Sequence, residues 1–287
     1  MSIKPVTEFL LWDNCNNNCD FCFQRKNPRL FSVKKQDKIL GNIKQFIESD
    51  RFIKGSHILV VGGELFDVYR ECLLGFFNFI VEKMLINDID NLYLNTNLIY
   101  NDTYYSMLKP ILNLFESNNL FDRLKFTTSF DIAGRFKTQE SKSMMLNNLL
   151  RLKDDYEKLK TVVNIILTKQ CCESILTNKF DIFDFMSSLR VNTNLIPYIV
   201  FKKDLCGTRN DIFSALLKLN EQNPEYIRQY VINMDLKNKR YLYACYPDQL
   251  KLCSCEDSEC GHSINFKKYS LESDSCFVCD LKRVFDI

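Results

Sequence analysis

The stretch TEFLLWDNCNNNCDFC, residues 7–22, joins a predicted strand directly to three closely spaced cysteines. The run TEFLLW, residues 7–12, is short, apolar and rich in β-forming side chains, as expected of a strand. Cys15, Cys19 and Cys22 follow it with the spacing CxxxCxxC. In a chain with no visible secretion signal, clustered thiols are more typical of metal ligands than of a disulfide framework.

The order of strand and then helix repeats along the chain. Further strands are predicted at 57–61, 91–95, 124–130, 161–167 and 195–201, and helices after residue 32 and at 69–84, 103–115, 141–156, 173–189 and 211–219. Helical connections favour parallel pairing with right-handed crossovers. Six such units cannot close an eight-stranded barrel, so they predict an α/β protein with an open partial barrel or a doubly wound sheet. In both architectures the site lies at the C-terminal ends of the strands.

Bulk composition excludes several classes of protein. The chain has 287 residues, of which 46% are hydrophobic and 13% aromatic, enough for a sizeable buried core. Lys and Arg number 38 against 36 Asp and Glu, a net charge of +2, so no overall field attracts nucleic acid or an anionic membrane. No stretch approaches the roughly 18 apolar residues of a membrane span. We expect a cytoplasmic enzyme that binds neither membrane nor bulk nucleic acid.

The loop of Cys15, Cys19 and Cys22 can hold a metal in more than one way. Three thiolates leave a tetrahedral zinc ion one ligand short, whereas a four-iron, four-sulfur cluster held by three thiolates keeps one iron open. An open iron is a reactive position. Zinc with a fourth ligand from elsewhere in the chain, and plain structural cysteines, are the alternatives.

The loop CNNNCDFC resembles the cluster loop of radical S-adenosylmethionine (SAM) enzymes, including the aromatic Phe21 before the third cysteine. Gly62, Gly63 and Glu64 directly follow the second predicted strand and resemble the family's GGE motif, which holds the amino group of the cofactor's methionine portion. Adjacent glycines let backbone approach a ligand closely, and a carboxylate can accept from an ammonium group. Where the family often has Pro next, this chain has Leu65.

The resemblance covers roughly residues 5–205 and implies a partial (β/α)6 barrel with parallel strands. By position it implies that Asn97, after the third strand, faces the cofactor, that Ser129 and Asp131 bind the ribose hydroxyls, and that Arg135 pairs with the methionine carboxylate. The alternatives are a polar cap at the end of the third strand and a surface ion pair between Asp131 and Arg135. Strand period alone leaves the direction of Asn164 and Tyr198 open.

The resemblance also implies the class of enzyme, an oxidoreductase or a transferase, and its chemistry. A reduced 4Fe-4S cluster donates one electron to SAM, and the resulting 5′-deoxyadenosyl radical abstracts hydrogen from a substrate. We expect this substrate to be a peptide or a nucleoside. An external one-electron donor of the flavodoxin or ferredoxin type is implied, because the chain has no GxGxxG motif. The alternatives are a zinc-stabilised binding protein without catalysis and an activase of glycyl-radical enzymes.

After residue 237 the sequence becomes rich in cysteine and polar residues, which predicts a division into a barrel domain, 1–237, and a small metal-binding tail, 238–287. A CxC pair and a CxxC pair in the tail are typical of a four-cysteine site for an auxiliary iron-sulfur cluster or a structural zinc ion. The expected ligands are Cys253, Cys255, Cys276 and Cys279, with Cys245, Cys260 and His262 as alternatives. Core packing is expected for Cys72, Cys171, Cys172 and Cys206.

Overall fold

The computed structural model describes residues 5–11, 15–20, 33–66, 70–132, 134–197, 208–246, 251–254 and 285. Their strands form one sheet of eight, in the order β6-β5-β4-β3-β2-β1-β7-β8. The first six strands pair in parallel in chain order. They are β1 (Val6–Leu10), β2 (Ser56–Val61), β3 (Ile89–Asn95), β4 (Leu124–Phe130), β5 (Lys160–Leu167) and β6 (Asn192–Pro197). The prediction of an open α/β sheet built from six βα units is confirmed.

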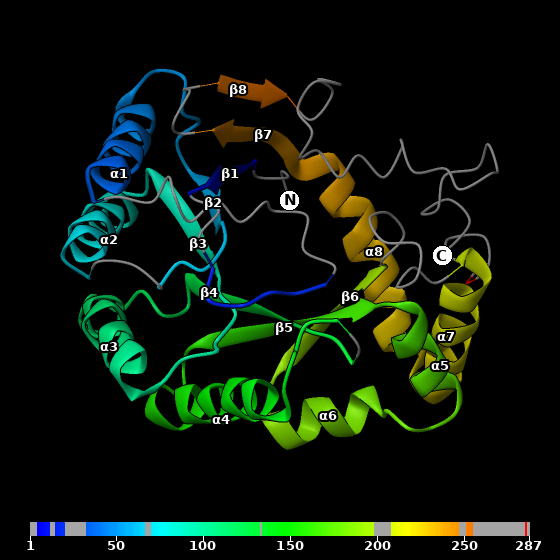
Figure 1. Cartoon of the computed structure of the whole chain (residues 1–287). Helices are drawn as coiled ribbons and strands as arrows, with labels where there is room; N and C mark the ends of the chain where they lie inside the picture. The colour runs from blue at the N-terminus through cyan, green and yellow to red at the C-terminus, as the bar shows by residue number, and fades with distance from the viewer. Residues whose placement is uncertain are drawn as a thin grey trace.

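Helices follow the strands around the outside of the curved sheet (Figure 1). They are α1 (Val33–Glu48), α2 (Arg70–Leu85), α3 (Asp102–Ser117), α4 (Gln139–Asp155), α5 (Lys169–Leu176), α6 (Ile182–Leu189), α7 (Arg209–Gln222) and α8 (Pro224–Arg240). The prediction of one helix over 173–189 is wrong. That stretch holds the end of α5 and the whole of α6, because Asn178 takes a left-handed conformation and Asp181 caps the next helix by accepting from two backbone N–H groups.

Two strands that the sequence analysis did not predict extend the sheet beyond β1. Strand β7 (Tyr241–Tyr246) pairs with β1 in parallel, and β8 (Lys251–Ser254) pairs with β7 in antiparallel fashion. Helix α8 runs from the β6 end of the sheet back towards β7 (Figure 1). Residue 237 thus falls within α8, and the described strands of the expected tail belong to the main sheet. The division of the chain at that residue stays a prediction.

One face of the sheet is packed against helices through aromatic side chains. Burial alternates strictly along β4, as side chains of a strand point to opposite faces. On the helix-covered face Phe66 stacks on Phe77 at 6.4 Å between ring centroids, and Phe126 and Phe115 lie within 6.2 Å of this pair. Since Phe66 comes two residues after Glu64, this cluster anchors the turn after β2 in the core.

The opposite face of the sheet carries polar side chains. Glu8, Tyr93 and Lys125 share one row of the register across β1 to β4, and the Lys125 ammonium lies 5.0 Å from the centre of the Tyr93 ring. Burial raises the pKa of Glu8 from its ordinary value of 4.5 to about 7. Glu8 is therefore a carboxyl group that changes its charge near neutral pH.

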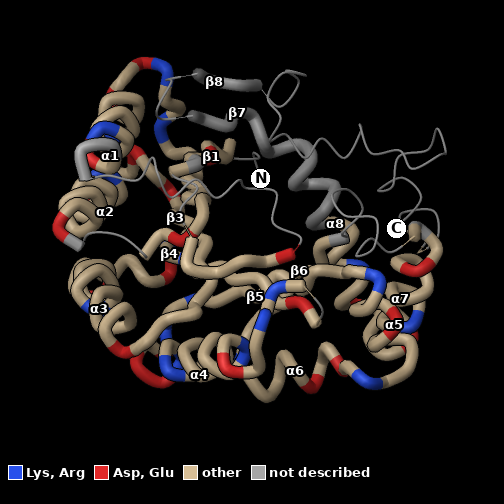
Figure 2. Tube along the Cα trace, in the orientation of Figure 1, with Lys and Arg blue, Asp and Glu red and all other residues tan. Residues whose placement is uncertain are grey.

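Charges of both signs alternate over the helices (Figure 2). No single-sign strip of the kind that tracks a nucleic-acid backbone follows the described helices, in agreement with the near-neutral net charge. Among the described residues there is also no helix with the length and apolar character needed to cross a membrane.

Shortening Phe77 to alanine should destabilise the fold by about 3–5 kcal/mol, because it removes a fully buried ring from the aromatic cluster and leaves a cavity. Urea unfolding followed by circular dichroism measures the loss. Phe79→Ala is the matched control: Phe79 is on the same helix but only partly buried, so its loss should be clearly smaller. Equal losses for the two variants would contradict the proposed core.

Glu8 should make the stability of the protein fall as the pH rises. Between about pH 4.5 and about pH 7 its carboxyl ionises in the unfolded chain but stays protonated in the folded one. Ionisation stabilises the unfolded state, so the free energy of unfolding decreases over this range. Above about pH 7 both states are ionised and the loss is complete. Glutamine cannot ionise, so the stability of Glu8→Gln should not fall in this way. Relative to the wild type, the variant should gain about 1–3 kcal/mol in the free energy of unfolding between low pH and about pH 8.

The measurement is the free energy of urea unfolding at about pH 5 and about pH 8. The change between these two pH values should be smaller in Glu8→Gln than in the wild type. Glu221→Gln, at an exposed position of α7, should keep the pH dependence of the wild type. An unaltered pH dependence in Glu8→Gln would show that Glu8 has no such role.

Candidate functional site

The first two cysteines of the predicted cluster loop lie just beyond the carboxyl end of β1. Cys15 and Cys19 form no disulfide. Three N–H groups point at their sulfurs: the backbone N–H of Asn17 at 3.4 Å and Nδ2 of Asn97 at 3.6 Å from Cys15 Sγ, and Nδ2 of Asn17 at 3.2 Å from Cys19 Sγ. Such donors stabilise thiolates, the form that binds metal, so these residues fit a thiolate-held metal cluster.

The third cysteine, Cys22, lies outside the described residues. Within the part of the chain that the structure describes, no three His, Cys, Asp or Glu side chains gather as a metal site. The assignment of Cys15, Cys19 and Cys22 as three metal ligands therefore stays a prediction. The structure places two of these residues, Cys15 and Cys19, after β1 as expected.

The turn Gly62-Gly63-Glu64 follows β2, at the same edge of the sheet. The Glu64 side chain is fully buried, and its carboxylate accepts four hydrogen bonds. Oε1 accepts from Thr96 Oγ1 at 2.8 Å, Tyr100 Oη at 2.7 Å and the backbone N–H of Phe66 at 3.2 Å, and Oε2 accepts from the N–H of Asn97 at 2.6 Å. Burial raises the pKa of Glu64, and these hydrogen bonds partly offset that rise.

Asn97 connects the cysteine loop to the Gly-Gly-Glu turn. Its backbone N–H donates to Glu64, while its side-chain Nδ2 lies 2.6 Å from Asn16 Oδ1 and 3.6 Å from Cys15 Sγ. Asn16 in turn donates to the carbonyl of Ile99 at 2.7 Å. The structure therefore brings together the two motifs that the sequence places 40 residues apart, counted from residue 22 to residue 62.

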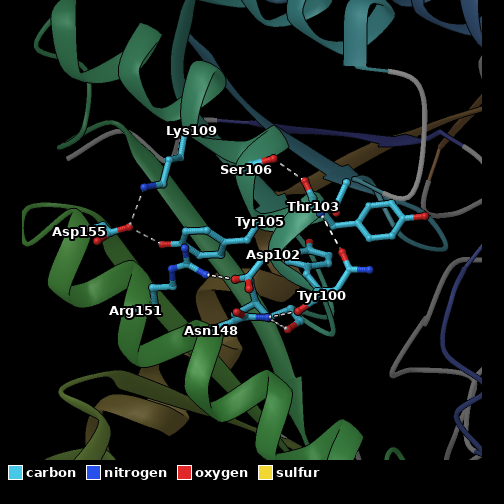
Figure 3. A network of polar contacts seen from close by, with 12 residues as sticks. Tyr100, Asp102, Thr103, Tyr105, Ser106, Lys109, Asn148, Arg151 and Asp155 are labelled. Atoms are coloured by element: carbon cyan, nitrogen blue, oxygen red, sulfur yellow. Dashed lines mark hydrogen bonds and ion pairs between the residues drawn. The ribbon is translucent and has the colours of Figure 1, made fainter.

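Helix α4 fixes the segment that carries Asn97. Buried Asn148 donates from Nδ2 to the carbonyls of Leu98 at 3.0 Å and Tyr100 at 2.8 Å (Figure 3). Beside it, the Arg151 guanidinium lies 3.8 Å from the centre of the Tyr105 ring and donates to Asp102 at 2.6 Å. These contacts join α3 to α4 and hold the segment between β3 and α3, including Leu98 in its left-handed conformation.

The loop after β4 brings Asp131 and Arg135 beside the cysteine loop. Asp131 is fully buried and accepts from the N–H of Gly134 and, at 2.8 Å, from Thr168 Oγ1. Arg135 is only 6% exposed, and its Nε is buried without a hydrogen-bond partner. Its backbone carbonyl accepts from Asn17 Nδ2 at 3.1 Å. Both side chains are buried, so they do not form a surface ion pair.

A polar row crosses the open face of the sheet near the same edge. Ser129, Asn164 and Asn194 are opposite one another on β4, β5 and β6, and all are half-buried. Asn194 Nδ2 donates to Asn164 Oδ1 at 3.2 Å. Asn164 thus shares the face of Ser129, which strand period could not decide; Tyr198 lies outside the described residues.

The remaining cysteines fall into two groups. Cys171 and Cys172 are buried and Cys72 is half-buried, as core packing predicts, and burial raises the pKa of Cys172 to about 12 and that of Cys72 to about 11. Thiols of this kind are unreactive. In the tail, Cys253 belongs to β8 opposite Ala244, whereas Cys255, Cys276 and Cys279 lie outside the described residues, as does Cys206, so the tail site stays a prediction.

Sequence reasoning missed Asn17, whose side chain contacts the predicted ligand Cys19. The signal for Asn17 was its place between two metal-ligand candidates in CNNNC, but three consecutive asparagines offered no way to choose among them. Tyr100 was also missed, because an aromatic side chain after a strand usually packs in the core, and here its hydroxyl reaches Glu64.

No family model and no curated protein matches the chain by sequence. Its structure is similar to solved structures of anSMEcpe: to one with bound AdoMet (SAM), with a TM-score of 0.57 and 14% identity over 85% of this chain and 72% of that one, and to one with AdoMet and the Cp18Cys peptide, with a TM-score of 0.54 and 14% identity over 83% and 62%. It is also similar to coproporphyrinogen III oxidase (HemN) from Escherichia coli, described as a radical SAM enzyme.

The HemN match has a TM-score of 0.50 and 12% identity over 77% of this chain and 52% of that one. The chain thus spans 62% of the peptide-bound anSMEcpe structure and about half of HemN. At identities this low the likeness concerns architecture, and it agrees with the parallel order of β1 to β6. The chain has the fold of the radical SAM enzymes.

Proposed function

We propose that the chain is a radical SAM enzyme, in which a 4Fe-4S cluster held by Cys15, Cys19 and Cys22 supports reductive cleavage of SAM. The observation that carries this proposal is Asn97, which contacts both a cysteine of the cluster loop and the carboxylate of the Gly-Gly-Glu turn. When bound, the cluster supplies the single electron that splits SAM into methionine and a 5′-deoxyadenosyl radical, which takes hydrogen from the substrate.

The chain's own residues bind and orient the cofactor. Gly62 and Gly63 have no side chain, so their backbone can approach the amino group of SAM, while Glu64 fixes the turn from within the core through its four hydrogen bonds. Ser129 is half-buried and available to a ribose hydroxyl. Asp131 holds the loop that carries Arg135 through its bonds to Gly134 and Thr168.

Arg135 is suited to the carboxylate of SAM. Its Nε is a buried donor without a partner, and an unsatisfied buried donor of this kind is costly unless a ligand completes it. A guanidinium group offers a planar pair of N–H donors that matches a carboxylate. Its closeness to the cysteine loop, through Asn17, would keep the bound SAM beside the cluster.

The proposed substrate is a polar molecule, a peptide or a nucleoside. The open face of the sheet supports this, because the polar side chains of Glu8, Lys125, Ser129 and Asn164 lie on it, among apolar ones such as Leu59. One similar structure holds a peptide together with AdoMet. We further propose an external electron donor of the flavodoxin or ferredoxin type.

The substrate can be identified by isotope transfer. When unlabelled SAM is used with deuterated candidate peptides or nucleosides, deuterium should appear in 5′-deoxyadenosine only with a true substrate.

The decisive experiment is anaerobic reconstitution of the full chain with iron and sulfide, followed by incubation with SAM and dithionite. The proposal expects a brown protein with the visible absorbance of an iron-sulfur cluster, and 5′-deoxyadenosine as a product. A colourless protein that binds zinc stoichiometrically would overturn it and support a zinc-stabilised binding protein instead.

Replacement of Cys15, Cys19 or Cys22 by alanine should reduce iron content and 5′-deoxyadenosine formation to background, because each change removes one of three ligands. Cys72→Ala is the matched control, since Cys72 lies on α2 and bonds Gln36 rather than the cluster loop. Iron analysis and chromatography of the products give the two readouts. Full activity in any of the three loop variants would contradict the assignment.

Replacement of Arg135 by methionine should weaken SAM binding by about ten- to a hundred-fold, as expected for loss of a charged hydrogen bond worth about 1.5–3 kcal/mol. Methionine can fill much of the buried space, so the fold should persist. Equilibrium binding of SAM to the reconstituted protein measures the effect, and Arg228→Met, at an exposed position of α8, should bind as the wild type does. Wild-type affinity in Arg135→Met would exclude Arg135 as the carboxylate site.

A further inference from the structure

The three asparagines of the cysteine loop have different surroundings. Asn16 is exposed and bonds the Ile99 carbonyl and the Asn97 side chain. Asn18 is also exposed. Asn17 is only 7% exposed, and it is the residue whose side chain lies against a cysteine sulfur of the loop and also against the loop after β4.

The orientation of the Asn17 amide follows from its contacts. Its oxygen accepts from the backbone N–H of Asn18 at 2.9 Å. The opposite atom, Nδ2, is 3.1 Å from the carbonyl oxygen of Arg135, which can only accept. The same Nδ2 is 3.2 Å from Cys19 Sγ, so its second hydrogen is available to the sulfur. The network therefore fixes the N–H groups, rather than the oxygen, toward Cys19.

We infer that Asn17 is a positioning residue that raises the reduction potential of the cluster by donating a hydrogen bond to the sulfur of Cys19. This inference rests on the proposed function. Hydrogen bonds to ligand sulfurs stabilise the more negative, reduced state of an iron-sulfur cluster and so shift its potential upward. Because Asn17 is nearly buried, the donor is held away from competing water, and the contact with the Arg135 carbonyl keeps it in place.

The test compares midpoint potentials of anaerobically reconstituted full-length proteins, equilibrated with redox dyes and followed by visible absorbance. Asn17→Ala removes the donor and should lower the potential while iron and sulfide content stay at the wild-type level. Asn17→Asp has nearly the same shape and retains an acceptor for the Asn18 N–H, but it places a carboxylate beside the sulfur. It should lower the potential further.

Asn18 supplies matched controls in the same loop. Asn18→Ala should keep the wild-type potential, and Asn18→Asp should shift it less than Asn17→Asp, because its charge is screened by water. Asn17 variants with full clusters at the wild-type potential would overturn this inference and leave the proposed function intact. Loss of the cluster from both Asn17 variants would also overturn it, since it would assign Asn17 a purely structural role. A wild-type chain that takes up no cluster would refute the proposed function itself.

Discussion

The candidate site depends on one buried carboxylate. A carboxyl group enclosed by protein is costly unless hydrogen bonds replace its lost water, and Glu64 obtains them from three residues after β3 and from Phe66. This requirement makes the chain after β3 fold over the turn after β2. Asn97 is thereby placed with its backbone on Glu64 and its side chain free to reach the cysteine loop.

The parallel sheet determines which loops can meet in this way. Carboxyl ends of parallel strands lie at one edge, so the segments after β1, β2, β3 and β4 gather there although they are far apart in sequence. Polar side chains then join these segments. Glu64 in the second segment accepts from the backbone N–H of Asn97 in the third, and the Asn97 amide reaches the first. The Asn17 amide links the first segment to the fourth, and Asn148 of α4 holds the third. Small polar side chains thus fix the positions of these segments relative to one another, which the sheet alone does not determine.

The sequence was informative where local pattern decides the outcome. The run LKFTTSF, 124–130, is β4 with both ends correct, because alternation and flanking turn residues are local. Helix α8 and strands β7 and β8 were not predicted. The position of β7 depends on its pairing with β1, a contact between distant parts of the sequence that local pattern does not reveal. The motifs pointed to Cys15 and Glu64, but the roles of Asn17, Thr96 and Tyr100 depend on neighbours distant in sequence, which one sequence does not reveal.

The pairing of β7 with β1 bears directly on the cysteine loop. Without it β1 would be an edge strand, with one row of backbone groups open to other partners. With β2 on one side and β7 on the other, β1 is an interior strand, and Phe9, opposite Cys245 in the register, is fully buried. Because β7 is parallel to β1, it also ends at the edge of the sheet where the cysteine loop begins. The C-terminal part of the chain therefore helps to fix the strand from which the proposed cluster ligands extend.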